Sequence, residues 1–271
     1  MLTEIAPAKI NLALHLRRRR PDGYHDLETI FAFTEFGDTL HVTPATDLSL
    51  AVSGGFADAA GAGDDNLVLR AARALAAAAG VSAGAAMTLE KQIPVAAGLG
   101  GGSADAAAAL RLLSRLWSLD WPPARLEAIA AGLGADVPAC VQSRTCFGTG
   151  RGDSLAPWSD DLAGTPVLLV NPRVAVPTGP VFAGWDQQDR GGIHAGTPIT
   201  ALRNDMTAAA LAIAPVIGDV LAALEATQPV LARMSGSGAT CLALYADIAA
   251  RDTAAAQLAP HGWWQTATAL R

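Results

Sequence analysis

Lysine is almost missing from this sequence: Lys9 and Lys91 are the two lysines among its 19 basic residues. Each of them lies beside a segment that other features also single out. Acidic residues outnumber basic ones by 25 to 19, which gives a net charge of −6 and a pI of about 5.3. Because non-specific nucleic-acid binding depends on a basic surface, we expect no nucleic-acid partner.

Cysteines are few, and long apolar runs are absent. The three cysteines, Cys140, Cys146 and Cys241, have no CxxC spacing, and the five histidines form no HxxxH or HExxH pattern. Neither a disulfide framework nor a zinc site is therefore expected.

Nothing in the sequence suggests a membrane protein. The positive mean hydropathy of +0.29 results from the many alanines. The longest apolar stretch, about 206–217, is shorter than the roughly 20 residues that a membrane-spanning helix needs. The N-terminus has an early acidic residue and no basic stretch before an apolar one, which argues against a signal peptide. We expect a cytoplasmic protein with reduced cysteines and no membrane partner.

Alternating polarity predicts strands near the N-terminus. In residues 8–16, Ile10 and Leu12 face one way while Lys9 and Asn11 face the other. Further strands are expected at 29–36 and 39–43. The arginine run 17–20 precedes a Pro-Asp-Gly turn and is expected in a solvated loop, where its field could attract an anionic substrate.

Capping residues and glycines predict the helices. Asp65 or Asn66 should begin a helix that ends near Ala79, with Gly80 as its stop. Ser103 is an N-cap candidate for a helix that extends to Trp117. The remaining elements expected are a helix framed by Pro122-Pro123 and Gly132, a helix from Met206, and strands at 87–93, 167–170 and 240–245.

A glycine loop is the most informative segment. Four glycines occupy five positions at 98–102, between a predicted strand and a predicted helix. Such a loop lets the backbone approach a phosphate, and the helix N-terminus points its N–H groups at the anion. A tight turn would need fewer glycines. The P-loop pattern fails because no lysine follows the glycines, and GxGxxG fails because Ser103 replaces its last glycine.

Several segments together resemble one family. Residues 94–103 resemble the central motif of the galactokinase, homoserine kinase, mevalonate kinase and phosphomevalonate kinase (GHMP) superfamily, and residues 234–240 resemble its C-terminal motif. Residues 6–12 and 21–25 are similar to one branch of it. Members of that branch phosphorylate the 2-hydroxyl of 4-diphosphocytidyl-2-C-methyl-D-erythritol in the non-mevalonate isoprenoid pathway. The similarity runs nearly end to end.

The resemblance implies an α+β fold of two domains. It implies a ribosomal-S5-like, ATP-binding N-terminal domain at 1–157 and a ferredoxin-like C-terminal domain at 158–271 that completes the substrate cleft. The sequence pattern changes at about 155–162, where we place the boundary.

The resemblance also assigns roles. It implies that Asp136 orients the acceptor hydroxyl and takes its proton, and that Lys9 steadies the γ-phosphate of ATP. Mg²⁺ is inferred from the reaction, since it usually rides on substrate phosphates, and no carboxylate identifies itself as its ligand. By residue type alone, Asp136 could be a surface loop acid and Lys9 part of a solvated strand face.

The implied ATP contacts are Pro94, Ala96, Ala97, Gly98, Leu99, Gly100, Gly101, Gly102, Ser103, Ala104, Asn66 and Lys91. Ala104 stands where relatives often carry a second serine, so one hydroxyl contact is lost there. Asn66 could instead be a helix cap, and Lys91 an exposed strand lysine.

The implied contacts to the acceptor, a small molecule with a cytidine diphosphate group, are Asn11, Tyr24, His25, Thr178, Phe182, Gly236, Ser237 and Gly238. Phe182 would stack on the base, although it could also be ordinary core. No protein partner is indicated.

Three alternatives remain open. Another GHMP kinase, for mevalonate, homoserine or a sugar, would keep both glycine loops. A catalytically silent ligand sensor of this superfamily would lack Lys9 or Asp136. A generic α/β protein with an incidental glycine loop would not carry so many motifs in order.

Overall fold

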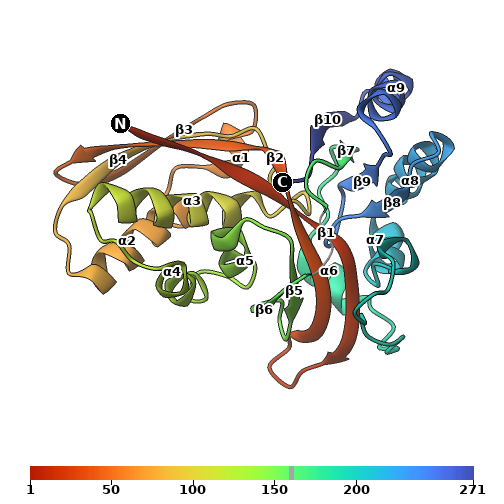
Figure 1. Cartoon of the computed structure of the whole chain (residues 1–271), viewed down its shortest axis with the longest axis horizontal. Coiled ribbons are helices and arrows are strands. Elements are labelled where there is room, and N and C mark those ends of the chain that lie inside the picture. The colour runs from red at the N-terminus through yellow and green to blue at the C-terminus, as the bar shows by residue number, and fades with distance from the viewer. Residues whose placement is uncertain (159–161) are drawn as a thin grey trace. The chain divides into compact units, whose positions relative to one another are not determined.

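The computed structural model describes residues 1–158 and 162–271. The chain forms two compact units (Figure 1), each with its own set of strands and helices. The first unit comprises Met1–Lys9, Phe36–Val95 and Gly100–Arg144. The second comprises Ile10–Glu35, Ala96–Leu99 and Thr145–Arg271. The long strands β1 (Leu2–Arg19) and β2 (His25–Ala45) contribute residues to both.

The first unit contains a sheet in the order β3-β4-β2, and β1 pairs with β2. Strand β3 (Leu48–Ser53) runs parallel to β4 (Gly84–Glu90), and β4 is antiparallel to β2. Gly37 allows β1 and β2 to approach closely, because a Cβ there would lie 2.2 Å from the Ala6 carbonyl oxygen. Strand β2 covers both predicted strands, 29–36 and 39–43, without a break.

Four helices of the first unit, α2 to α5, pack against one another below these strands in the view of Figure 1, whereas α1 contacts β3. Helix α2 begins after Asn66, whose Oδ1 accepts a hydrogen bond from the Val68 N–H, and it ends at Gly80 in the left-handed conformation. Both ends were predicted from the capping pattern. The helices are α1 (Ala57–Ala60), α2 (Leu67–Ala79), α3 (Gly101–Leu116), α4 (Pro123–Ala130) and α5 (Val137–Gln142).

In the second unit, β5 (Cys146–Thr149) pairs with β2, and β6 (Ser154–Pro157) pairs with β5. A separate four-stranded sheet has the order β10-β7-β9-β8, with every neighbouring pair antiparallel. Its strands are β7 (Pro166–Asn171), β8 (Leu231–Met234), β9 (Cys241–Leu244) and β10 (Trp264–Ala269).

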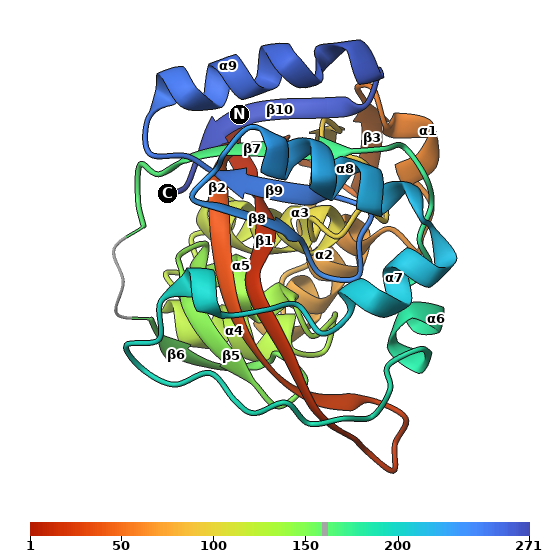
Figure 2. The same ribbon diagram turned by 90° about the vertical axis from the view of Figure 1, so that its right-hand side faces the viewer.

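Helices α8 (Val216–Ala226) and α9 (Ile248–Leu258) cover one face of this four-stranded sheet (Figure 2). Their buried side chains, including Ile217, Val220 and Leu258, belong to the same hydrophobic core cluster as Leu168 and Val170 of β7. The chain order β-α-β-β-α-β with this strand order is the ferredoxin-like arrangement. The fold is thus the α+β fold that the sequence predicted. Two short helices, α6 (Thr178–Ala183) and α7 (Thr207–Ile213), complete the unit.

Several local predictions were wrong. Ser103 is not an N-cap: Gly100 takes that place, and Ser103 lies in the first turn of α3. The face of β1 that carries Lys9 and Asn11 is buried, as is His15, which excludes the alternative in which Lys9 lies on a solvated strand face. The arginine run continues strand β1 through Arg19 rather than forming a loop.

The domain boundary predicted at 157/158 stays a prediction. Part of the 155–162 segment in which it was placed, residues 159–161, lies outside the described residues.

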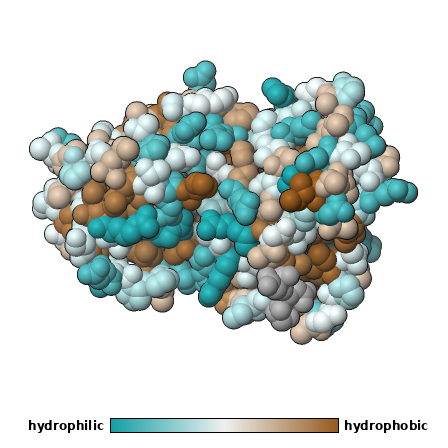
Figure 3. Space-filling view, turned by 45° about the horizontal axis from the view of Figure 1, so that its top comes forward, coloured by the Kyte–Doolittle hydropathy of each residue, from teal (hydrophilic) through white to brown (hydrophobic). Residues whose placement is uncertain are grey.

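Within the ranges 1–158 and 162–271, no helix is long and apolar enough to cross a membrane. On the face drawn in Figure 3, hydrophilic residues are interspersed with hydrophobic ones.

Candidate active site

An ion pair joins the two residues to which the sequence assigned the chemistry. The Nζ atom of Lys9 lies 2.9 Å from Oδ2 of Asp136. The Lys9 side chain is 5% exposed, whereas that of Asp136 is 37% exposed. The carboxylate therefore combines a fixed cationic partner with access to solvent, and hence to a small molecule.

Asp136 owes its position to a short helix that the sequence reading missed. It is the residue before α5, and its carboxylate makes no capping bond to that helix, so it is available to Lys9. Arg111 of α3 holds α5 in place by donating from Nη1 to the carbonyl oxygens of Cys140 (2.7 Å) and Val141 (3.1 Å). Pro138 in the first turn is the signal that could have indicated this helix.

The glycine loop ends at the start of α3, beside Lys9. Gly100 has φ +60°, and a Cβ at this position would lie 2.8 Å from Cε of Lys9. Both facts require glycine here. The first N–H groups of α3 have no acceptor within the helix, so Gly101, Gly102 and Ser103 present backbone donors at this end.

The middle of the loop belongs to the second unit and packs on the other glycine loop. Gly98 has φ +77°, and a Cβ there would lie 2.4 Å from the Ser235 carbonyl oxygen. The Ser235 hydroxyl donates to the Gly98 carbonyl (2.8 Å) and accepts from the Asn11 N–H (3.1 Å). The two glycine motifs, which are far apart in the sequence, thus lie in direct contact around Ser235.

The second loop is fixed by Asn204, which was not a predicted site residue, and by residues that were predicted. Nδ2 of Asn204 donates to the carbonyl oxygens of Met234 and Gly236, at 2.8 Å each. Ser237 shares a 3.0 Å hydroxyl hydrogen bond with Thr178, and Nδ2 of Asn11 donates to Thr29 (2.7 Å). The residues predicted to bind the acceptor substrate, Asn11, Thr178 and 236–238, therefore all lie within the second unit.

Two of the predicted ATP contacts are already occupied by protein groups. The Asn66 amide accepts from the Val68 N–H and donates to the Gly61 carbonyl (2.8 Å). Lys91 is not the exposed strand lysine of the alternative reading: it is 3% exposed and bound to two carboxylates.

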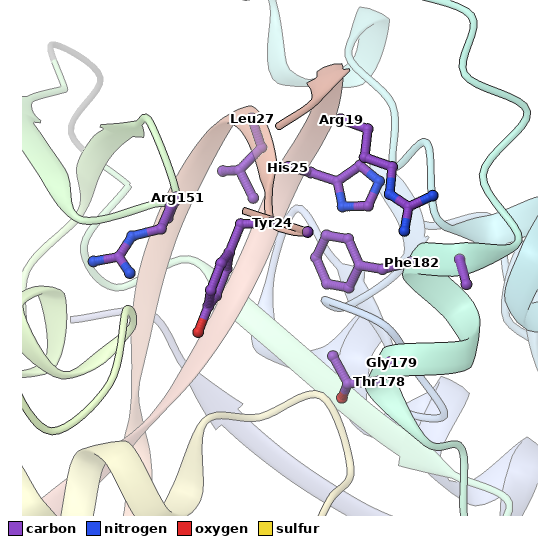
Figure 4. A pocket seen from close by; sticks show the side chains of 10 residues that line it. Arg19, Tyr24, His25, Leu27, Arg151, Thr178, Gly179 and Phe182 are labelled. Atoms are coloured by element: carbon purple, nitrogen blue, oxygen red, sulfur yellow. The ribbon is translucent and has the colours of Figure 1, made fainter. Parts of the chain in front are cut away.

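A pocket of about 350 Å³ in the second unit contains the predicted aromatic residues. Figure 4 shows the side chains of Tyr24, His25 and Phe182 pointing into it. The His25 and Phe182 rings are 5.2 Å apart between centroids. Tyr24 is 54% exposed, so its ring is available to a ligand.

Two cationic residues of this pocket, Arg19 and Arg151, were not predicted as site residues (Figure 4). The guanidinium of Arg151 lies 5.2 Å from the Tyr24 ring centroid, and its Nε and Nη2 donate to Asp153 at 2.9 and 2.6 Å. Arg19 belongs to the run 17–20, whose field was expected to attract an anionic substrate. Nothing in the sequence marks Arg151, which is one of 17 arginines.

The pocket controls the protonation of His25. Burial lowers the pKa of His25, and the nearby Arg19 charge lowers it further. The imidazole is therefore neutral at pH 7, with one nitrogen that donates and one that accepts a hydrogen bond. Such a ring can form hydrogen bonds with the edge of a heterocyclic base.

Among the residues that the structure describes, no group of three or more His, Cys, Asp or Glu side chains could hold a metal ion.

The comparisons with known proteins agree with this fold. Residues 66–144 match the family described as GHMP kinases N terminal domain, and residues 195–262 match GHMP kinases C terminal. A crystal structure of homoserine kinase from Cytophaga hutchinsonii has the same fold, with a TM-score of 0.72 at 14% identity over 99% of this chain and 94% of that one. The fold and the two matched ranges are those of the GHMP kinases, a class of ATP-dependent small-molecule kinases.

Relatives with higher sequence identity indicate the family within this class. The chain is 55% identical to the 4-diphosphocytidyl-2-C-methyl-D-erythritol kinase of Rhizorhabdus wittichii, over 99% of this chain and 94% of that protein. It is 53% identical to the kinase of the same name from Novosphingobium aromaticivorans, over 100% and 93%. A crystal structure of 4-(cytidine 5'-diphospho)-2C-methyl-D-erythritol kinase superposes with a TM-score of 0.85 at 33% identity, covering 99% of both chains. The chain belongs to the family of 4-diphosphocytidyl-2-C-methyl-D-erythritol kinases.

Proposed function

We propose that this chain transfers the γ-phosphoryl group of ATP to the 2-hydroxyl of 4-diphosphocytidyl-2-C-methyl-D-erythritol, a step of the non-mevalonate isoprenoid pathway. The observation that carries the proposal is the 2.9 Å pair of Lys9 and Asp136, with Lys9 against Gly100, the residue before α3. Relatives with the corresponding name align over the full length of the chain.

The chemistry needs little covalent help from the protein. Phosphoryl transfer requires an oriented hydroxyl and neutralised phosphate charge. In our proposal the Asp136 carboxylate accepts a hydrogen bond from the acceptor hydroxyl and takes its proton as the new O–P bond forms and the bond to the leaving ADP oxygen breaks. Lys9 holds Asp136 in place and offsets the charge of the transferring group.

The glycine loop is the proposed phosphate site. Backbone N–H groups at 101–103 and the α3 dipole favour an anion. When bound, Mg²⁺ would supply further charge neutralisation on the phosphate oxygens. Because no protein group in the described ranges offers three metal ligands, we propose that the ion is carried mainly by the nucleotide.

The aromatic pocket is the proposed cytosine site. A pyrimidine between the Tyr24 and Phe182 rings would gain stacking energy of about 1–3 kcal/mol. Neutral His25 can bond the edge of the base, and Arg19 and Arg151 can interact with its anionic substituents. Thr178 lines the same pocket and is a proposed contact.

The alternatives are less well supported. A mevalonate, homoserine or sugar kinase has no need for an aromatic pocket of this kind. A silent sensor would have lost Lys9 or Asp136, and both are present and paired. We further propose that the enzyme works in the cytoplasm, with no nucleic-acid or membrane partner.

An ATP-consumption assay across a panel of alcohols tests the function. The panel contains the diphosphocytidyl substrate, the same methylerythritol phosphate without cytidine, mevalonate and homoserine. We expect turnover with the first compound and at least about a hundredfold lower kcat/KM with the others. Comparable or faster turnover of mevalonate or homoserine would refute the proposed substrate, and no turnover of any alcohol would refute the activity.

A further inference from the structure

A buried ion cluster lies against the first residue of α3. Lys91 forms ion pairs with Asp38 and Asp105, the second at 2.9 Å from Nζ to Oδ2. The three side chains are 3%, 0% and 4% exposed. We refer to Asp38, Lys91 and Asp105 as the Lys91 cluster.

The cluster fixes the chain that enters the glycine loop. Oδ1 of Asp38 accepts the backbone N–H groups of Gln92 (2.5 Å) and Ile93 (2.8 Å), the two residues before Pro94. The backbone N–H of Lys91 donates to the Ser53 carbonyl at 2.7 Å. The approach to the loop is therefore bound on both its side-chain and backbone groups.

The same cluster fixes the chain that leaves the loop. Asp105 lies on α3, four residues after Gly101. A Cβ at Gly101 would lie 2.9 Å from Nζ of Lys91 and 3.1 Å from Cγ2 of Ile93. The start of α3 thus packs directly on the ammonium group, and any shift of that group would move the end of the loop.

The charge of the cluster suits a neighbouring anion site. Two carboxylates and one ammonium would leave a net negative charge in the protein interior, which is costly. Burial raises the pKa of Asp105, and the Asp38 carboxylate raises it too, against the lowering effect of Lys91. Oδ1 of Asp105 accepts no hydrogen bond from the described residues, so it is available for a proton. With Asp105 protonated, the cluster is neutral.

We propose that the Lys91 cluster is a positioning device for the nucleotide, which clamps both ends of the glycine loop so that its N–H groups are preorganised for the phosphates of ATP. Lys91 acts through the loop and not by touching the nucleotide, because contact would require it to leave two buried carboxylates. The inference rests on the proposed ATP site at this loop. A clamp of this kind sets the affinity for ATP and leaves the acceptor pocket unchanged.

Three variants test the clamp. Lys91→Met removes the ammonium at similar length. Asp105→Asn keeps an oxygen that can accept from Lys91, and it mimics the neutral acid. Arg115→Met is the control, since it removes an exposed ion pair to Glu4 from the same helix. For each variant we would measure the Kd of ATP by calorimetry, the KM of both substrates, kcat and the free energy of unfolding.

We expect Lys91→Met to raise the Kd and KM of ATP at least about tenfold, because small misplacements of a site cost that much or more. The KM of the acceptor should stay within about twofold. Asp105→Asn should bind ATP within about threefold of the wild type, and Arg115→Met should match it. A folded Lys91→Met enzyme with wild-type ATP affinity, or one in which both KM values rise equally, would overturn the proposal.

If Lys91→Met does not fold, Asp105→Ala separates α3 from Lys91 while Asp38 keeps its partner. We expect it to raise the Kd of ATP at least about threefold, and an unchanged Kd would overturn the clamp. The direct ATP measurement needs no acceptor. A wild-type enzyme that binds ATP but phosphorylates no diphosphocytidyl alcohol would therefore refute the proposed function and leave the clamp standing.

Discussion

Replacing Asp136 by asparagine removes one negative charge and keeps the size and hydrogen-bonding reach of the side chain. The Asp136 side chain is 37% exposed, so solvent screens its pair with Lys9, but the Lys9 side chain is only 5% exposed. Exposed ion pairs contribute about 0–1 kcal/mol to stability, and breaking a buried one costs more because a charge is left without its partner. Since the asparagine oxygen can still accept a hydrogen bond from Lys9, we expect the free energy of unfolding to fall by no more than about 2 kcal/mol.

The effect on turnover should be far larger. A residue that orients a hydroxyl and takes its proton contributes about 10²–10⁴ in rate, which corresponds to about 3–5 kcal/mol in the activation free energy. Since the expected loss of stability is smaller than this, partial unfolding could not produce the loss of kcat. The Kd of ATP should remain within about threefold, because the proposed phosphate site consists of backbone groups.

The assay is ADP release at saturating ATP and acceptor, with ATP affinity measured separately by calorimetry. Asp252→Asn is the matched control, since it breaks an ion pair to Arg251 with a side chain that is 56% exposed. The control should keep the wild-type kcat. If Asp136→Asn keeps kcat within about threefold, or loses ATP binding to the same extent as kcat, the assignment of Asp136 to the chemical step is refuted.

Three further predictions concern other parts of the molecule. Phe182→Ala should raise the KM of the acceptor about 5- to 100-fold through lost stacking and leave that of ATP unchanged; initial-rate kinetics test this, and equal rises in both would contradict it. Gly98→Ala should destabilise the protein and weaken ATP binding, because its Cβ would meet the Ser235 carbonyl at 2.4 Å at φ +77°. Gly164→Ala is the control for backbone strain alone, since Gly164 has φ +79° and its added Cβ would meet nothing within 4 Å. Urea unfolding should therefore show a smaller loss of stability for Gly164→Ala than for Gly98→Ala. Burial, with Asp38, raises the pKa of Asp105 from 3.8 to about 8, so folding retains a proton that the unfolded chain releases. The free energy of unfolding of the wild type, relative to that of Asp105→Asn, should therefore fall as pH rises from about 4 to about 8. The same difference between the two proteins at pH 5 and at pH 8.5 would contradict this.

Features that depend on local chemistry could be predicted from the sequence. Helix α2 begins and ends where Asn66 and Gly80 indicated, because capping uses groups within a few residues. The glycine loop before α3 was recognisable because Gly98 and Gly100 combine a positive φ with a backbone approach that a Cβ would block. The family resemblance then supplied the fold and named Lys9 and Asp136 as a pair.

Features that depend on which distant segments meet were decided by the tertiary structure. The sequence left Lys91 as either an ATP contact or an exposed strand lysine, and its burial follows from Asp38 on β2 and Asp105 on α3 converging on it. Arg19 and Arg151 are two arginines among many until the fold brings them to the same pocket.

The physical reason is one of range. Backbone preferences, caps and turns act over a few residues, so the sequence alone predicted most of the elements and the glycine loop. Burial and electrostatic environment are set by side chains from separate strands and helices, so the surroundings of Lys91, Asp105 and the pocket arginines were decided by the tertiary structure.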